Sequence, residues 1–191
     1  MIIGVEPAYD PITEKPYCCV PAVLQMIQRR RGIEYDSQDE IGYQLGLIVP
    51  NEIAHMFGRV RTGKKPVSGW GTQTSKEEYS IDNYFTSNNY PLRLEIHGID
   101  ESEDVCEFIS MKITDGCDII LCYNSWSLFG DGDTEHVSLI QSIDTMSREV
   151  TIIDPAIRAP KIRRASSSKL FNILKNHAVS ELGGLWVISS S

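Results

Sequence analysis

The sequence lacks long apolar runs. No unbroken apolar stretch among its 191 residues is long enough to cross a bilayer. The start, Met-Ile-Ile-Gly-Val-Glu-Pro, has neither a basic region nor an apolar stretch of signal-peptide length. We therefore expect a cytoplasmic protein with no membrane partner. The length is usual for one domain with a sizeable core, so we expect a single domain over residues 1–191.

Positive charge is also scarce. The chain has 18 Lys and Arg residues against 26 Asp and Glu residues, a net charge of -8. Because nucleic-acid binding needs a basic surface that neutralises phosphates, we expect no nucleic-acid partner. Three basic clusters, at 29–31, 59–65 and 161–164, are expected to be solvated helix ends or loops.

Several motifs that would indicate other chemistry are missing. There is no internal repeat, no phosphate-binding glycine loop, no Gly-x-Ser-x-Gly and no zinc pattern of Cys-x-x-Cys pairs. We expect no metal and no cofactor. The five cysteines are an odd number and Cys18 and Cys19 are adjacent, so without a signal peptide we expect reduced thiols.

The most informative stretch that is present places a cysteine at the start of a helix. Its apolar residues have the spacing of one helical face: Val20, Val23, Leu24 and Ile27. Pro21 is comfortable only in a first helical turn, so the helix should begin near Cys19 or Val20. The free N–H groups and the positive dipole end at that position favour a thiolate, as a reactive cysteine requires. The alternative is that the Cys18-Cys19 pair is simply core.

The order of the remaining patterns predicts an α+β fold. Helices dominate the first half, with caps expected at Ser37, Asn51 and Ser75, and a long surface loop is expected over 59–74. Further helices are expected over 102–114 and 168–176. Strand patterns fall mostly in the second half, at 92–97, 118–123, 136–143, 149–153 and 185–188. Early helices followed by a run of strands favour N-terminal helices packed on a C-terminal antiparallel sheet.

One of the four histidines stands where a catalytic base would be useful. His136 opens a strand after a polar loop, whereas His55, His97 and His177 are expected to be surface or capping residues. Asp154 ends the next strand. Because the beginning of one strand meets the end of the next in an antiparallel hairpin, we expect Asp154 to hold the His136 ring.

Taken in order, three segments resemble the C39-like cysteine peptidases of the papain-like superfamily. They are Cys19-Val20-Pro21-Ala22, the strand that begins at His136, and the strand that ends in Asp154-Pro155. The resemblance implies a papain-like fold and a peptidase or amidase acting on a peptide or protein through an acyl-enzyme. It implies Cys19 as nucleophile, His136 as base and Asp154 as orienting acid. The 18-residue spacing from His136 to Asp154 also resembles phytochelatin synthases, so acyl or peptidyl transfer is an alternative.

The chain departs from the family pattern at two positions. Val20 replaces the usual glycine, and the glutamine that helps to bind the oxyanion six residues before the cysteine is Thr13 here. Thr13, or Gln73 from the long loop, is the candidate replacement donor. These departures leave open a catalytically inactive binding module. Cys18 is the alternative nucleophile if the helix starts one residue earlier, although the proline register favours Cys19.

Overall fold

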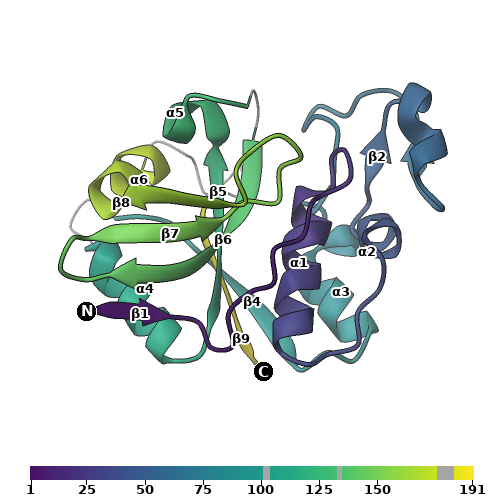
Figure 1. The fold of residues 1–191 in the computed structure, drawn as a ribbon. Coiled ribbons are helices and arrows are strands. Elements are labelled where there is room, and N and C mark those ends of the chain that lie inside the picture. The colour runs from purple at the N-terminus through teal and green to yellow at the C-terminus, as the bar shows by residue number, and fades with distance from the viewer. Residues whose placement is uncertain (101–103, 133–134, 176–182) are drawn as a thin grey trace.

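The computed structural model describes residues 1–100, 104–132, 135–175 and 183–191. The chain forms a helical part and a sheet part that lie side by side (Figure 1). The helical part contains α1 (Cys19–Arg30), α2 (Gln38–Gln44), β2 (Ile48–Val49), η1 (Asn51–Met56), β3 (Arg61–Thr62), η2 (Glu77–Tyr79) and α3 (Ile81–Ser87). The sheet part contains β1 (Ile2–Gly4), β4 (Leu92–His97), α4 (Val105–Thr114), β5 (Asp118–Asn124), α5 (Ser125–Phe129), β6 (Glu135–Asp144), β7 (Glu149–Ile153), β8 (Ile162–Ser166), α6 (Ser167–Leu174) and β9 (Gly184–Ser190).

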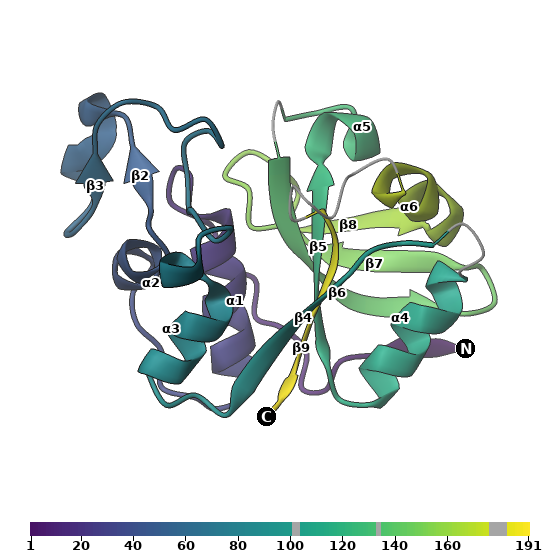
Figure 2. The ribbon, with the colours of Figure 1, turned by 180° about the vertical axis from the view of Figure 1, so that it is seen from behind.

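The sheet is antiparallel throughout and holds the late part of the chain together. Its strand order is β4-β9-β5-β6-β7-β8, and β1 pairs with β6. Helices α4 and α6 pack on this sheet (Figure 2), while α1 packs against β6 and α2. The α+β class and the placement of N-terminal helices against a C-terminal antiparallel sheet are therefore confirmed.

Local sequence signals account for the helices of the first part. The apolar face of α1 is buried in the main core, as the spacing of Val20, Val23, Leu24 and Ile27 predicts. Ser37 caps α2 by accepting a hydrogen bond from the Glu40 N–H. Each of these helices begins where the sequence predicted.

Some element boundaries differ from expectation. The cap of α3 is Ser80, not Ser75, because the 75–79 segment forms only the short η2 turn. Pro50, not Asn51, precedes the short η1 helix, which is of the 3-10 type. The 59–74 loop contributes β3, which pairs in parallel with β2. The expected helix start at Ser102 and the end at Asn176, with His177, lie outside the described residues.

The basic run at the end of α1 was expected to be solvated, but only Arg29 is, and Arg30 and Arg31 are not. The side chains of Arg30 and Arg31 are only 8% and 14% exposed, and both bind the buried carboxylate of Asp118. Tyr9 donates a further hydrogen bond to Asp118 from its hydroxyl. These bonds join the C-terminal end of α1 to the first residue of β5, and so fix the helical part against the sheet.

Among the described residues, no helix combines the length and the apolar character needed to cross a membrane.

Candidate functional site

Cys19 is the first residue of α1, and Cys18 precedes it at the cap position without making a side-chain cap bond. Cys19 is partly exposed, and no acidic residue lies in the first turn of the helix. The helix dipole and the free N–H groups of the first turn therefore act on the thiol without a competing carboxylate from the helix itself.

His136 and Asp154 meet at one end of the β6–β7 hairpin. His136 is the second residue of β6, and Asp154 follows β7 directly. The His136 Nε2 atom lies 2.8 Å from the Asp154 Oδ1 atom, a hydrogen-bonding distance. The contact between His136 and Asp154 that the strand pattern predicts is therefore present.

The thiol of Cys19 reaches the same histidine. The Cys19 Sγ atom, a ring nitrogen of His136 and a carboxylate oxygen of Glu14 all lie within 4.8 Å of one another. Because Nε2 of His136 is bound to Asp154, the Nδ1 atom is the nitrogen left to face the sulfur. The structure thus brings the Cys19 sulfur close to the histidine that Asp154 binds.

The segment before α1 is held against the sheet part at this point. The backbone N–H of Glu14 donates to the carbonyl oxygen of Pro155 at 2.9 Å. Pro155 directly follows Asp154, so this bond ties the approach to Cys19 to the loop that carries the aspartate. The site is therefore built where the two parts of the molecule meet.

The electrostatics of the pair favour a charged imidazole. Burial lowers the pKa of His136, but hydrogen bonds to Asp154 and Cys19 and their negative charges raise it to about 10. Burial raises the pKa of Asp154, yet its bonds to His136, the Ala156 N–H and Arg163 lower it below the ordinary 3.8. Imidazolium and carboxylate are thus the stable forms of this pair at neutral pH.

Arg163 is a site residue that the sequence analysis missed. Its Nη1 atom donates to Asp154 Oδ2 at 3.2 Å, and Nη2 binds Asp131 at 2.8 Å. The guanidinium also lies over the Phe129 ring, 3.6 Å from its centre. Arg163 was grouped with a solvated basic cluster, because its partners come from distant segments and leave no local sequence signal.

The two adjacent cysteines have different environments. Cys18 is fully buried in a small apolar cluster with Leu47, Val49 and Phe57. Burial is the largest of the effects that raise the pKa of the Cys18 thiol. A buried thiol of this kind is a poor nucleophile, whereas Cys19 faces His136 and is partly exposed.

The two candidate oxyanion donors make hydrogen bonds elsewhere or face the solvent. The side chain of Thr13 is exposed, and its carbonyl oxygen accepts a hydrogen bond from Gln38. The Gln73 amide bonds to Ser68 and to carbonyls of its own loop, such as Gly71. Glu14, next to Thr13, lies beside Cys19, and no sequence pattern singles it out.

The other histidines show no comparable arrangement where they are described. His55 is exposed on η1, and the His97 ring stacks on Phe108 with ring centres 4.1 Å apart. Three side chains lie close enough together to bind a metal ion: Glu14, Cys19 and His136. Their oxygen, sulfur and nitrogen atoms are all of types that zinc binds.

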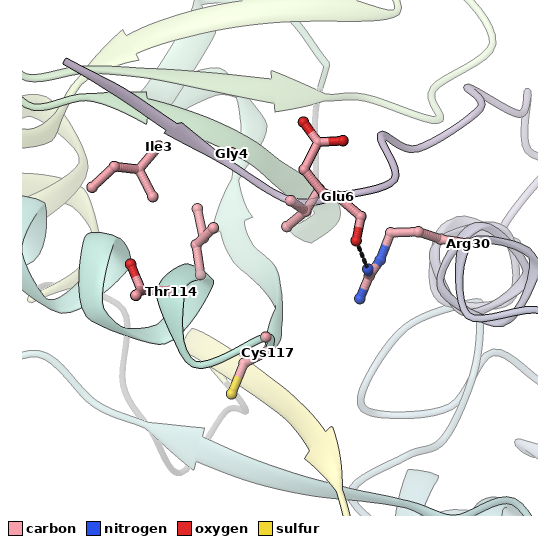
Figure 3. Close-up of a pocket in the computed structure, with 9 residues that line it drawn as sticks. Ile3, Gly4, Glu6, Arg30, Thr114 and Cys117 are labelled. Atoms are coloured by element: carbon pink, nitrogen blue, oxygen red, sulfur yellow. Dashed lines mark hydrogen bonds between the residues drawn. The ribbon is translucent and has the colours of Figure 1, made fainter.

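A hollow of about 220 Å³ opens beside the histidine and the aspartate. Its lining includes Glu14, His136, Asp154 and Arg158. A larger hollow of about 320 Å³ lies between β1 and the end of α4 (Figure 3). There Arg30 donates to the Glu6 carbonyl and also binds Asp118, so its charge is already paired. The smaller hollow is the one that adjoins reactive groups.

Neither a protein-family model nor a curated protein matches the sequence. Solved structures match its fold over nearly the whole chain. A Bacillus anthracis protein described as a C39-like peptidase aligns with a TM-score of 0.62 at 14% identity, covering 98% of each chain. The peptidase domain of Streptococcus ComA, a bifunctional ABC transporter involved in quorum sensing, gives a TM-score of 0.55 at 12% identity, covering 96% of this chain and 99% of that one. The protein therefore has the C39-like, papain-like α+β fold that its sequence motifs implied.

Proposed function

We propose that the protein is a cysteine peptidase or amidase in which Cys19 is the nucleophile, His136 the proton carrier and Asp154 the orienting acid. The observation that carries the proposal is that the Cys19 sulfur lies within 4.8 Å of a His136 ring nitrogen while the same ring is bound to the Asp154 carboxylate. A nucleophile, a base and a group that orients the base are the parts that acyl transfer to a thiol needs. The likeness of the fold to peptidase domains supports a peptide or protein substrate.

The proposed reaction proceeds through an acyl-enzyme. The Cys19 thiolate attacks the amide carbonyl carbon, and the carbonyl electron pair moves onto the oxygen. The intermediate then collapses, the C–N bond breaks, and the amine leaves with a proton from His136. His136 next takes a proton from water, which attacks the thioester and releases the acid and the free thiol.

The surroundings of His136 support this role. Asp154 binds the His136 ring and is itself bound by Arg163, and the Tyr123 ring packs edge to face on the His136 ring with ring centres 5.8 Å apart. The raised pKa of His136, about 10, favours the imidazolium that pairs with a thiolate. The five cysteines are all free, as a reducing compartment would keep them, and we propose that the protein acts in the cytoplasm.

The test is selective modification of the thiol. Brief treatment with iodoacetamide should alkylate Cys19 far faster than the adjacent Cys18, with fragmentation between the two residues identifying the modified one. The same site should be acetylated by p-nitrophenyl acetate, an activated ester that needs no particular peptide sequence. A His136→Gln variant should lose both reactions while remaining folded.

Cys18 is the built-in control, because it lies on the same peptide but is buried in an apolar cluster, whereas Cys19 lies beside His136. Alkylation of Cys19 no faster than that of Cys18 would overturn the proposal. Peptide hydrolysis, followed with a mixed peptide library in the presence and absence of added amines and thiols, then separates hydrolysis from transfer to those acceptors.

A further inference from the structure

Glu14 lies at the proposed site without a role in the reaction described so far. One of its carboxylate oxygens is within 4.8 Å of both the Cys19 sulfur and a His136 ring nitrogen. Its Oε2 atom is buried and has no hydrogen-bond partner among the described residues. A buried carboxylate oxygen without a donor is costly, so this group calls for an explanation.

The charges around Glu14 come from each element packed against it. His136 on β6 and Lys161 before β8 favour its anion, Asp154 after β7 disfavours it, and Cys19 lies at the start of α1. Arg158, Arg163 and Asp131 line the same hollow. Burial is the largest effect, and the pKa of Glu14 is raised above the ordinary 4.5.

The two forms of Glu14 would act on the reaction in opposite ways. A carboxylate beside the sulfur would repel both the thiolate and the oxyanion that forms after its attack. A carboxylic acid would instead offer one O–H donor next to the carbon under attack. The acid form also lowers the cost of the buried, unpartnered oxygen, because burying a neutral carboxyl group costs less free energy than burying a carboxylate.

We propose that Glu14 in its acid form donates a hydrogen bond to the oxyanion that forms when Cys19 attacks a carbonyl group. The proposal rests on the proposed function and adds a catalytic residue to it. The carbonyl electron pair moves onto oxygen as the S–C bond forms, and the Glu14 O–H stabilises that charge without transferring its proton. When the intermediate collapses the pair returns, the leaving group takes its proton from His136, and Glu14 is unchanged.

Neither residue named from the sequence supplies this donor. The Thr13 side chain is exposed, and the Gln73 amide is bonded within its own loop. Glu14 is held in place by the bond from its N–H to the Pro155 carbonyl, so its side chain enters the site from a fixed backbone. The donor is therefore placed before the substrate arrives.

The proposal predicts a distinctive dependence on pH. The donor exists only below the pKa of Glu14, so acylation should fall as pH rises through that value. In Glu14→Gln the amide N–H donates at every pH, and this decline should disappear. In Glu14→Ala the donor is lost at every pH, and acylation should fall about 10²- to 10³-fold in the range where the wild type is fastest.

Two reagents that meet the same thiol provide the test. Acetylation of Cys19 by p-nitrophenyl acetate passes through an oxyanion, whereas alkylation by iodoacetamide does not. Rates would be measured by mass spectrometry over a pH series for the wild type, Glu14→Gln and Glu14→Ala, each with and without EDTA. We expect the ratio of the acetylation rate to the alkylation rate to follow the predicted order, because the ratio removes the effect of the Glu14 charge on the thiolate itself. We expect EDTA to have no effect.

The outcomes separate this proposal from the proposed function. If Cys19 of the wild type reacts with neither reagent, the proposed function fails and this proposal fails with it. If Cys19 reacts with both, the Glu14 proposal alone is overturned by any of three results. These are equal acetylation in Glu14→Ala and the wild type, a parallel loss of alkylation in Glu14→Ala, and the same pH decline in Glu14→Gln as in the wild type. A response to EDTA would overturn it too, since the three side chains would then be holding a metal.

Discussion

Two aspartates in the described part of the chain, Asp118 and Asp154, are almost completely buried, and they differ in the groups that surround them. Asp118 begins β5 and accepts hydrogen bonds from Tyr9 Oη at 2.6 Å, Arg30 Nε at 2.7 Å and Arg31 Nε at 2.5 Å. Asp154 follows β7 and is bound by His136, Arg163 and the Ala156 N–H. Both carboxylates are thus satisfied, as burial requires.

The difference lies in whether a partner can give up a proton and take it back during a reaction. Arginines stay charged, and burial raises the pKa of Tyr9 well above its usual value, so the Asp118 cluster holds one state. Among the partners of Asp154, His136 is able to take up and release a proton, and it also reaches a thiol. A buried carboxylate by itself therefore does not indicate a catalytic site. A partner that can exchange a proton, such as His136, does.

Helix α1 connects the two aspartates. Its first residue, Cys19, faces the histidine that Asp154 holds, and its last residue, Arg30, binds Asp118. We infer that Asp118 fixes the far end of the helix while the near end carries the reactive group. Substitutions at the two aspartates should then separate stability from catalysis.

The largest effect is expected for Asp154→Ala. Removing the carboxylate leaves the His136 ring without its acceptor, and acetylation of Cys19 should fall on the order of 10³- to 10⁴-fold, as for orienting acids in other triads. The measurement is the rate with p-nitrophenyl acetate, with circular dichroism as a check of folding. Asp154→Asn is the matched variant. Its amide oxygen still accepts from the ring, but its NH2 group meets the Arg163 guanidinium, which is also a donor, so only part of the lost rate should return. A loss below tenfold in Asp154→Ala would show that the ring needs no such acceptor.

The next largest effect is on stability, in Asp118→Asn. This change leaves two buried guanidinium groups without a counter-charge, and breaking a buried pair in this way costs about 3–5 kcal/mol of unfolding free energy. Urea unfolding measures the loss, and alkylation of Cys19 in the folded protein should be unchanged. The control is Asp10→Asn at the same end of α1. The Asp10–Arg29 pair is 61% and 49% exposed, so its loss should cost less than about 1 kcal/mol. If Asp118→Asn and Asp10→Asn lowered the unfolding free energy equally, the buried Asp118 cluster would stabilise the fold no more than an exposed ion pair does.

The contact between His136 and Asp154 could be predicted from the sequence, but the Asp118 cluster could not. The hairpin of β6 and β7 follows from strand patterns on both sides of a short turn, and antiparallel pairing then brings the two ends together. Arg30 and Arg31 were read as solvated because a charge run does not reveal its partner. Asp118 lies 87 residues from Arg31, and only the packed fold shows that they meet.

The same limit applies to the elements and residues that were missed. The strand β8 carries two arginines in five residues, Ile-Arg-Arg-Ala-Ser, which is no strong strand pattern. Helix α5 has only five residues and is capped by Asn124 at the end of β5. The role of Glu14 depends on where the approach to α1 docks, through a bond to Pro155 that no local pattern specifies.

The third prediction uses pH to distinguish the two clusters. The pKa of His136 is raised in the folded protein, from 6.5 to about 10, so its charge contributes stability fully below pH 6.5. That contribution is lost as pH rises through about 10. The unfolding free energy should therefore fall over this range, and His136→Gln should reduce the fall. Asp118→Asn should instead lower the unfolding free energy by a similar amount at every pH. The measurement is urea unfolding at a series of pH values, and an unchanged slope in His136→Gln would contradict the assignment.

The smallest effect is expected for Asp131→Asn, which tests how Arg163 supports Asp154. Arg163 bridges Asp154 and Asp131, but the Asp131 side chain is 51% exposed, and an ion pair on that side contributes less than about 1 kcal/mol. Arg163 keeps its contact with the Phe129 ring and its bond to Asp154 when Asp131 is neutral. Acetylation of Cys19 should then stay close to the wild-type rate, while Arg163→Leu, which leaves one side of the buried Asp154 without a donor, should lower both that rate and the unfolding free energy. A large loss of acetylation rate in Asp131→Asn alone would mean that Arg163 is positioned by Asp131, its solvent-facing partner. The exposed ion pair would then be needed to keep Arg163 bound to Asp154.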